Sequence, residues 1–476
     1  MGKLLIKNGY IVSMNEKREV FNGGSILIED DRIKAIGKID EKLLDSNVEI
    51  YDAQGKIILP GLVNTHVHLS QQLGRGIADD VVLLTWLRER IWPYESSFNY
   101  EDSLISSIAC CVEMIKSGTT TFLEAGGQYV DAMVEAVEKC GLRACLCKST
   151  MDEGEGLPKP WQKTTEEELR EQEELFKKYN NAADGRIKIW FGLRTIFNNS
   201  DDLIVGTKKL ADKYNTGIHM HVLEVKEEMD YTRATRGETT VEHLYRLGAL
   251  GPNLVAAHVV WLTEREIDLF RLYDVKASHN PAAAMKVVLG FARIPEMMEK
   301  GITVGIGTDG APSNNRMDMM RDMYLTSLLH KGRTLDPKSV SAEEVLEMAT
   351  INGAKCALQE KEIGSLEVGK KADLIVLNPD TIHALPLVDP IANIVYAMSS
   401  ENVESTMCNG KWLMKEKKIL FLDEKELLEK VKKQSKKVLD RAGVKLPNRF
   451  PVVGLSLLIN LYSLLKVAPH VLCRCG

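Results

Sequence analysis

The sequence lacks the charge imbalance and the long apolar runs that mark nucleic-acid-binding and membrane proteins. It has 61 Lys and Arg residues against 67 Asp and Glu residues, and the two signs are interspersed without a basic stripe. A nucleic-acid partner is therefore not expected, and the partner should be a small molecule. The apolar tail at residues 451–476 is interrupted at Lys466, short of the ~18 to 20 residues that span a bilayer, so a membrane partner is not expected either.

Several short motifs are also missing. The nine cysteines show neither the C-x-x-C spacing of a zinc ribbon nor a regular disulfide framework, and the first residues contain no apolar signal region. Both absences favour a cytoplasmic protein with reduced thiols. The motifs H-E-x-x-H and G-x-S-x-G do not occur. Residues 305–310 fit G-x-G-x-x-G formally, but no ribose-binding acid follows in a βαβ unit, so a dinucleotide cofactor is not expected.

Two kinds of pattern divide the 476 residues, a length that predicts two or three compact units. Residues 1–59 and 362–422 alternate apolar and polar positions between Asn-Gly and similar turns, as short antiparallel strands do. Residues 60–361 instead alternate short apolar strands with amphipathic helices, which is typical of a parallel sheet. Eight strands are expected in this middle region, at residues 61–67, 119–124, 142–149, 187–193, 217–223, 254–260, 275–279 and 303–309.

Eight such units in residues 60–361 predict a (β/α)8 TIM-like barrel, so the expected fold class is α/β. Residues 1–59 and 362–422 should together build one small β-sandwich domain from both ends of the chain. A C-terminal helix is expected at residues 423–446, and the tail at 447–476 has no assigned role. The barrel helix at residues 102–117 is expected to begin with Asp102 as its N-cap.

Histidines gather at the ends of the expected strands. His66 and His68 are two residues apart, so on a strand their side chains point to the same face. In barrels of this class the ligands sit at the carboxyl ends of the strands. Five of the ten histidines and one aspartate fall at such ends, namely His66, His68, His221, His258, His279 and Asp309. This gathering predicts a metal site.

Three imidazoles and one carboxylate from this set suit zinc or iron(II) with an open position for water. Such an ion lowers the pKa of its bound water towards ~7. A second ion would require a bridging residue, such as a modified lysine, at the end of the fourth strand. That strand ends at Arg194, and Lys188 comes too early. One divalent ion per chain is therefore expected, with zinc favoured and iron as the alternative.

Glu224 follows His221 by three residues, where the chain leaves its strand. Its carboxylate can turn back over the bound water and transfer protons, whereas an isolated glutamate would more simply be a solvated loop residue. His219 lies deeper on the same strand face than His221, so we expect it to be a packed, hydrogen-bonded residue.

Six segments together resemble the amidohydrolase superfamily, in the branch of cytosine, adenosine and s-triazine deaminases and chlorohydrolases. They are LPGLVNTHVH, HMHVLE, VAAHVVW, SHNP, VGIGTDGAPSNN and IGSLEVGKKADLIVL. The resemblance covers roughly residues 3–445 in the right order. Within the branch, the chain is most similar to the 5'-methylthioadenosine/S-adenosylhomocysteine deaminases and the triazine hydrolases.

The resemblance implies roles for individual residues. The four metal ligands that it implies are His66, His68, His221 and Asp309. Glu224 would shuttle protons, Asp309 would also take a proton from the attacking water, and His258 would hydrogen-bond that water or polarise the substrate ring. The H-x-E with P-C-x-x-C signature of the unrelated zinc deaminase fold is absent.

Substrate-binding residues follow from the same resemblance. Trp86-Leu87 and the segment Trp92-Pro93-Tyr94-Glu95 match the part of nucleoside deaminases in which a glutamate holds the ribose hydroxyls, so Glu95 would take that role beside Trp86. Arg194 stands where those enzymes have histidine. An arginine at the barrel mouth indicates an acidic or strongly accepting group on the substrate, and a salt bridge to a loop carboxylate is the alternative.

The sequence therefore predicts a metal-dependent hydrolase that deaminates an N-heteroaromatic ring, with adenine of a 5'-modified nucleoside favoured. An s-triazine chlorohydrolase or aminohydrolase and a guanine deaminase are the alternatives with the same site. A non-catalytic scaffold is a third hypothesis, disfavoured because every expected ligand position is filled. A homo-oligomer, either a dimer or a tetramer, stays open.

Overall fold

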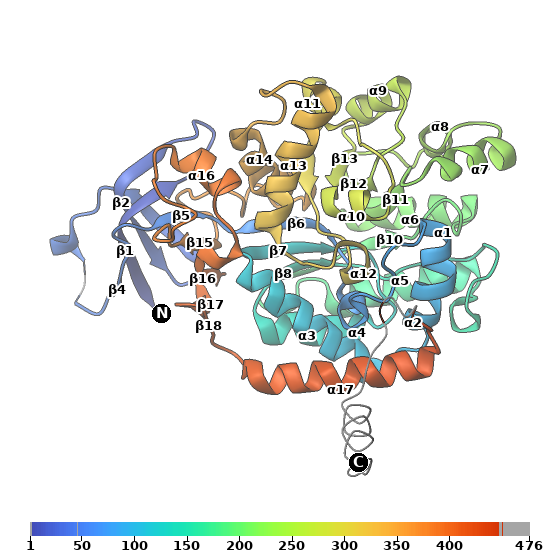
Figure 1. The fold of residues 1–476 in the computed structure, drawn as a ribbon, viewed down its shortest axis with the longest axis horizontal. Helices are drawn as coiled ribbons and strands as arrows, with labels where there is room; N and C mark the ends of the chain where they lie inside the picture. The colour runs from blue at the N-terminus through green and yellow to red at the C-terminus, as the bar shows by residue number, and fades with distance from the viewer. Residues whose placement is uncertain (1, 45, 447–449, 451–476) are drawn as a thin grey trace, which may run out of the picture.

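The computed structural model describes residues 2–44, 46–446 and 450, and its ribbon contains two separate sheets (Figure 1). One sheet is parallel and carries most of the helices. The other contains strands from both ends of the chain. The apolar tail at 451–476 lies outside the described residues.

The parallel sheet closes into a barrel. Its strands are β6 (Leu62–Val67), β7 (Thr119–Glu124), β8 (Arg143–Leu146), β9 (Ile187–Ile189), β10 (Phe191–Leu193), β11 (Ile218–Val222), β12 (Leu254–His258), β13 (Lys276–His279) and β14 (Val304–Ile306). They run in the order β10-β11-β12-β13-β14-β6-β7-β8-β9. Only Trp190 separates β9 from β10, so both edges of the sheet belong to one stretch of chain. The expected TIM-like barrel is confirmed, with its fourth strand divided in two.

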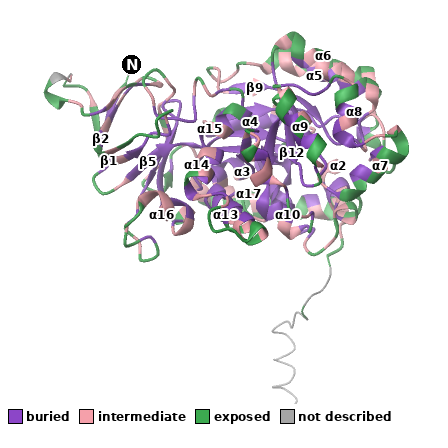
Figure 2. Ribbon diagram, turned by 90° about the horizontal axis from the view of Figure 1, so that it is seen from above, coloured by how far each residue is buried: buried purple, intermediate pink, exposed green. Residues whose placement is uncertain are grey.

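Almost every residue of the barrel strands is buried, and the buried residues concentrate there in Figure 2. Burial on both faces explains why these strands are short apolar runs without alternation. The helix expected at 102–117 is α3 (Tyr100–Lys116), whose N-cap is Asn99. The prediction of Asp102 as the N-cap was wrong by three residues. The Asp102 carboxylate instead accepts a hydrogen bond from the Asn99 backbone amide in a capping box, an arrangement that also favours an acid at this position.

The second sheet has nine strands. They are β1 (Lys3–Val12), β2 (Val20–Glu29), β3 (Arg32–Gly37), β4 (Glu49–Asp52), β5 (Ile57–Pro60), β15 (Leu374–Leu377), β16 (Val403–Cys408), β17 (Lys411–Lys415) and β18 (Lys418–Ile419). The central pairing joins β5 to β15, more than 300 residues away in sequence. The sheet has a core of its own, which includes Ile6, Ile26 and Met407. The expected β domain from both chain ends is confirmed.

Gly61 connects the two sheets, because β5 ends at Pro60 and β6 begins at Leu62. A Cβ atom at Gly61 would lie 2.0 Å from the side chain of Thr120, so only glycine fits at this crossing. The Gly61 amide donates to the carbonyl of Asp373 (3.0 Å), the residue before β15. The Asp373 carboxylate in turn forms a buried ion pair with Arg143 on β8, at an Oδ2–Nε distance of 2.9 Å. Through its carbonyl and its carboxylate, Asp373 thus fixes the barrel and the β domain to each other beside Gly61.

The C-terminal helix α17 (Glu424–Ala442) lies along the outside of the barrel, below α3 in Figure 1. Gln434 and Arg441 hydrogen-bond the buried carboxylate of Asp102. Val438 is fully buried in a cluster that also contains Trp86 and Tyr94, the latter on α2 (Trp92–Ser96). The helix therefore supports the segment that follows β6. Among the residues that the structure describes, no helix combines the length and apolar character needed to cross a membrane.

Candidate active site

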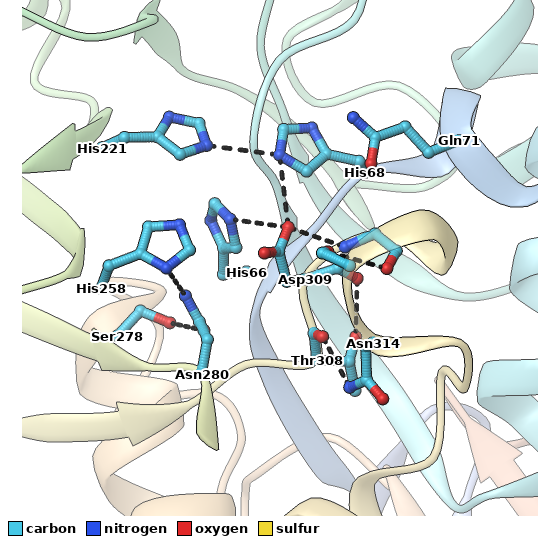
Figure 3. A network of polar contacts seen from close by, with 12 residues as sticks. His66, His68, Gln71, His221, His258, Ser278, Asn280, Thr308, Asp309 and Asn314 are labelled. Carbon is cyan, nitrogen blue, oxygen red and sulfur yellow. Dashed lines mark hydrogen bonds and ion pairs between the residues drawn. The ribbon is translucent and has the colours of Figure 1, made fainter. Parts of the chain in front are cut away.

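The carboxyl ends of β6, β11 and β12 and the loop after β14 bring histidines and one aspartate together, as Figure 3 shows. The ligand atoms of His66, His68 and His221 lie within 4.8 Å of one another. The same holds for His66, His258 and Asp309. All five side chains are buried. Residues up to 243 positions apart thus converge at one rim of the barrel, as the sequence predicted.

The spacing of the donor atoms matches a small cation. His68 Nε2 lies 3.3 Å from His221 Nε2, and Asp309 Oδ1 lies 3.4 Å from His66 Nε2 and 3.6 Å from His68 Nε2. Two ligand atoms that each lie about 2.0 to 2.1 Å from a tetrahedral ion are about 3.3 Å apart. Moreover, the buried Nε2 atom of His66 has no hydrogen-bond partner among the described residues. The four side chains therefore fit around one divalent ion.

Hydrogen bonds orient two of these imidazoles. His221 Nδ1 lies 2.9 Å from the carbonyl oxygen of Arg194. A carbonyl only accepts, so Nδ1 carries the proton and Nε2 presents its lone pair to the centre. His66 Nδ1 lies 2.8 Å from Nε2 of His219, which is buried. His219 is thus the packed, hydrogen-bonded residue that was expected. Such contacts behind a ligand fix its ring orientation.

Asp309 sits at a strained backbone position with φ of 64°. Its amide donates to the carbonyl of His66 (2.8 Å), and its Oδ1 accepts from the Gly310 amide (2.7 Å). A Cβ atom at Gly307 would lie 2.8 Å from the backbone nitrogen of His66, so this close approach requires glycine. Burial alone would raise the pKa of Asp309, but the neighbouring imidazoles hold it well below its ordinary value. The carboxylate therefore stays ionised.

Burial lowers the pKa of three of these imidazoles, because it disfavours their positively charged form. It lowers the pKa of His68 and His221 well below the ordinary value, and that of His258 to about 3. Neutral rings keep a lone pair for a cation. In His258 the Nδ1 atom accepts from Asn280 Nδ2 (3.2 Å), which places the ring proton on Nε2. His258 is thus arranged as a hydrogen-bond donor, whereas His221 is arranged as a ligand.

Glu224 lies beside this centre, with Oε1 3.7 Å from His258 Nε2. Its side chain is 14% exposed. Burial, reinforced by the charge of Asp309, raises the pKa of Glu224 to about 8. At neutral pH the group is therefore mostly protonated and can donate a proton to a bound ring.

A cavity opens in front of these residues. It is bordered by His68, His221, Glu224, His258 and Asp309, and also by Trp86 and Arg194. The Arg194 side chain is buried, and within the described part of the chain it has no hydrogen bond or ion pair. The alternative of a salt bridge to a loop carboxylate is therefore not seen. Because Arg194 borders the cavity, its guanidinium is available to an accepting or acidic group of a ligand.

Arg194 also borders a second cavity, which Glu95 lines as well. Glu95 belongs to α2, and its Oε1 accepts from Ser70 Oγ (3.0 Å) and Gln71 Nε2 (3.2 Å). Burial raises the pKa of Glu95 above its ordinary value. The structure therefore places Trp86 and Glu95 on two cavities that share Arg194.

Two side chains near the site have contacts that their positions in the sequence did not predict. His279 ends β13, but its Nε2 lies 3.1 Å from Nε2 of His330 on α13 (Met319–Thr334), and it belongs to neither group of ligand atoms. Glu228, which the sequence did not single out, borders the first cavity and binds the backbone beside Glu224. Its only sequence signal is its position four residues after Glu224.

Comparisons with known proteins agree with this geometry. The model of the amidohydrolase family matches residues 57–413. A 5'-deoxyadenosine deaminase of Methanobrevibacter smithii is 42% identical over 432 residues, which are 90% of this chain and 97% of that protein. A 5-methylthioadenosine/S-adenosylhomocysteine deaminase of Thermoanaerobacter pseudethanolicus is 36% identical over 438 residues, 92% of this chain and 100% of that protein. An adenosine deaminase of Xanthomonas campestris, solved with bound zinc, superposes with a TM-score of 0.88 at 26% identity and covers 92% of this chain and 99% of its own.

Proposed function

This chain belongs to the amidohydrolase family, and we propose that it is a metal-dependent hydrolytic deaminase of adenine in a 5'-modified nucleoside. Support comes from relatives at 36% to 42% identity over most of the chain that carry the names of such deaminases. It also comes from the site, where ligand atoms spaced 3.3 to 3.6 Å apart lie beside the protonated carboxyl group of Glu224. That juxtaposition is the observation that carries the proposal.

One divalent ion, zinc, would be held by His66, His68, His221 and Asp309. The lone pair of His221 Nε2 and the unpartnered His66 Nε2 favour this set, and the proton on His258 Nε2 disfavours that residue as a ligand. When bound, such an ion lowers the pKa of a coordinated water to about 7 and so supplies a nucleophile at neutral pH.

The protein's own groups would move the protons. Glu224 would give its proton to a ring nitrogen of adenine as water adds to the carbon that carries the amino group. Asp309 would accept the proton that this water loses, and His258 Nε2–H would donate a hydrogen bond to the adding oxygen. Return of a proton from Asp309 to the amino group allows the C–N bond to break, while the hydroxyl proton of the adduct passes to the Glu224 carboxylate and restores its acid form. Ammonia leaves, and a ring carbonyl replaces the amino group.

Substrate binding would extend across both cavities. Trp86 would pack against the base, and Glu95 would accept hydrogen bonds from the ribose hydroxyls. A carboxylate has about four lone-pair positions, so the contacts from Ser70 and Gln71 leave capacity for both hydroxyls. Arg194 would bind an accepting or acidic group of the substrate.

The test is a substrate panel with separate assays for ammonia and chloride. We expect ammonia from adenosine-type nucleosides such as 5'-deoxyadenosine, and loss of most of that turnover, with a measurable remainder, in the Glu224→Gln variant at unchanged metal content. Ammonia from guanine alone, or chloride from a chlorinated s-triazine without any nucleoside turnover, would replace this proposal by one of its alternatives. Absence of turnover with every substrate, in protein that contains metal, would leave the scaffold hypothesis.

A further inference from the structure

The carboxylate of Glu228 holds the backbone that carries Glu224. Glu228 lies in the first turn of α7 (Lys226–Arg236), is 1% exposed and reaches back over the end of β11. Its Oε1 accepts from the amide of Leu223 (2.8 Å), and its Oε2 accepts from the amide of Glu224 (3.3 Å). One side chain thus satisfies two successive amides at the point where the chain leaves the barrel strand.

The segment held in this way is strained. Leu223 has φ of 49°, in the left-handed region that side chains with a Cβ atom disfavour. From the opposite side, the Leu223 carbonyl accepts from the amides of Val260 (3.0 Å) and Trp261 (3.2 Å), which follow β12. The loop after β11 is therefore fixed between α7 and the loop after His258. Strained backbone of this kind persists where its surroundings determine it from several directions.

We propose that Glu228 is a positioning residue that keeps the Glu224 carboxyl beside His258 and directed at the substrate ring. The inference rests on the proposed function, since it requires Glu224 to transfer the proton. Glu228 borders the substrate cavity, but backbone amides engage both of its oxygens. It acts through the backbone of Glu224, not through contact with the substrate.

The test is a double-mutant cycle of Glu228→Gln with Glu224→Gln, with Glu227→Gln as the matched control because Glu227 is exposed on the same helix turn. Glutamine keeps the shape of Glu228 but offers one accepting oxygen for two amides. We expect E228Q to lower kcat about 10- to 100-fold, the scale of a misplaced catalytic group, with KM and metal content within about twofold of wild type. In the E224Q background the same change should cause no further loss, because the group that it positions is already gone.

Different outcomes contradict different claims. Unchanged kcat in E228Q, or a loss that multiplies with that of E224Q, would overturn the positioning role while leaving Glu224 as proton donor. A rise in KM alone would make Glu228 a substrate contact and would also overturn it. Full activity of E224Q would instead overturn the proposed function, and this inference with it. If E228Q does not fold, Glu228→Asp, whose shorter carboxylate cannot span both amides, should show the same selective loss of kcat.

Discussion

His66 Nδ1 and His219 Nε2 lie 2.8 Å apart, and their rings lie edge to edge with a centroid distance of 5.1 Å and an angle of 14° between their planes. The contact leaves His66 Nε2 pointing at Asp309 and couples a proposed ligand on β6 to a deeper residue of β11. His219→Phe keeps a ring in this place but removes the hydrogen bond. We expect metal affinity to fall about 10- to 100-fold, measured by competition with a chelator. His383→Gln, at an exposed histidine, is the control, and an equal loss there would contradict the account.

Asp309→Asn removes the negative charge of the proposed fourth ligand at almost constant shape. Because the neutral amide oxygen binds a divalent ion more weakly, we expect less than half the wild-type metal content after dialysis and at least a 1000-fold lower kcat. Elemental analysis and the ammonia assay measure the two effects, and excess zinc should not restore turnover, since the proton acceptor is lost as well. Wild-type turnover in D309N protein with bound zinc would show that this carboxylate accepts no proton.

The pH dependence of turnover should report Glu224. Its pKa is raised to about 8, so the acid form that donates the proton is present below about pH 8 and disappears above it. We expect kcat to fall tenfold per pH unit on the alkaline side of that value. A profile of kcat between about pH 5 and pH 10 measures this limb. An alkaline limb near the ordinary pKa of a glutamate would contradict the role of burial at this position.

Glu95 and Arg194 should affect different parts of the substrate. Glu95→Ala removes a charged acceptor, so kcat/KM for 5'-deoxyadenosine should fall about 10- to 100-fold, the effect of a lost hydrogen bond to an ionised group. The loss should be absent for an analogue that lacks both ribose hydroxyls. Arg194→Leu should raise KM for S-adenosylhomocysteine, which carries a carboxylate, more than for 5'-deoxyadenosine. Equal effects on both nucleosides would assign Arg194 to the base or ribose instead.

Asp322 provides a test of stability outside the proposed ligand set. Burial raises its pKa to about 8 against an ordinary value of 3.8, so the folded state binds the proton more tightly than the unfolded state. Its contribution to stability is complete below about pH 4 and is lost as the pH rises towards 8. Asp322→Asn removes this dependence. The free energy of unfolding of wild type should therefore fall relative to that of D322N by up to about 1.4 kcal/mol per pH unit in that window, as urea titrations can measure. If the free energies of unfolding of wild type and D322N change with pH in parallel, Asp322 makes no such contribution to stability.

Much of the fold and the rim of the barrel follow from local pattern. Period-two geometry places His66 and His68 on one face, and the rule that ligands gather at carboxyl strand ends selects His221 and Asp309. The same rule selects His279, although that ring turns to His330 on a helix 51 residues later. A strand end fixes where a residue lies but not which neighbour its side chain meets.

Other features depend on long-range contacts that one sequence does not encode locally. Glu228 carries no motif, and its importance becomes visible only when the left-handed backbone at Leu223 brings two amides to its carboxylate. Whether Arg194 forms a salt bridge likewise depends on which side chains border the two cavities, and the sequence alone does not show this. The break of the fourth strand at Trp190 arises where the barrel closes, between neighbours far apart in sequence.

The central claim is that one divalent ion at this rim is required for turnover, and zinc titration of metal-stripped protein tests it most directly. We predict that stripped protein has no deaminase activity and that activity rises linearly with added zinc to a plateau at one equivalent per chain. Full turnover by protein shown to be free of metal, or a plateau at two equivalents, would contradict the account.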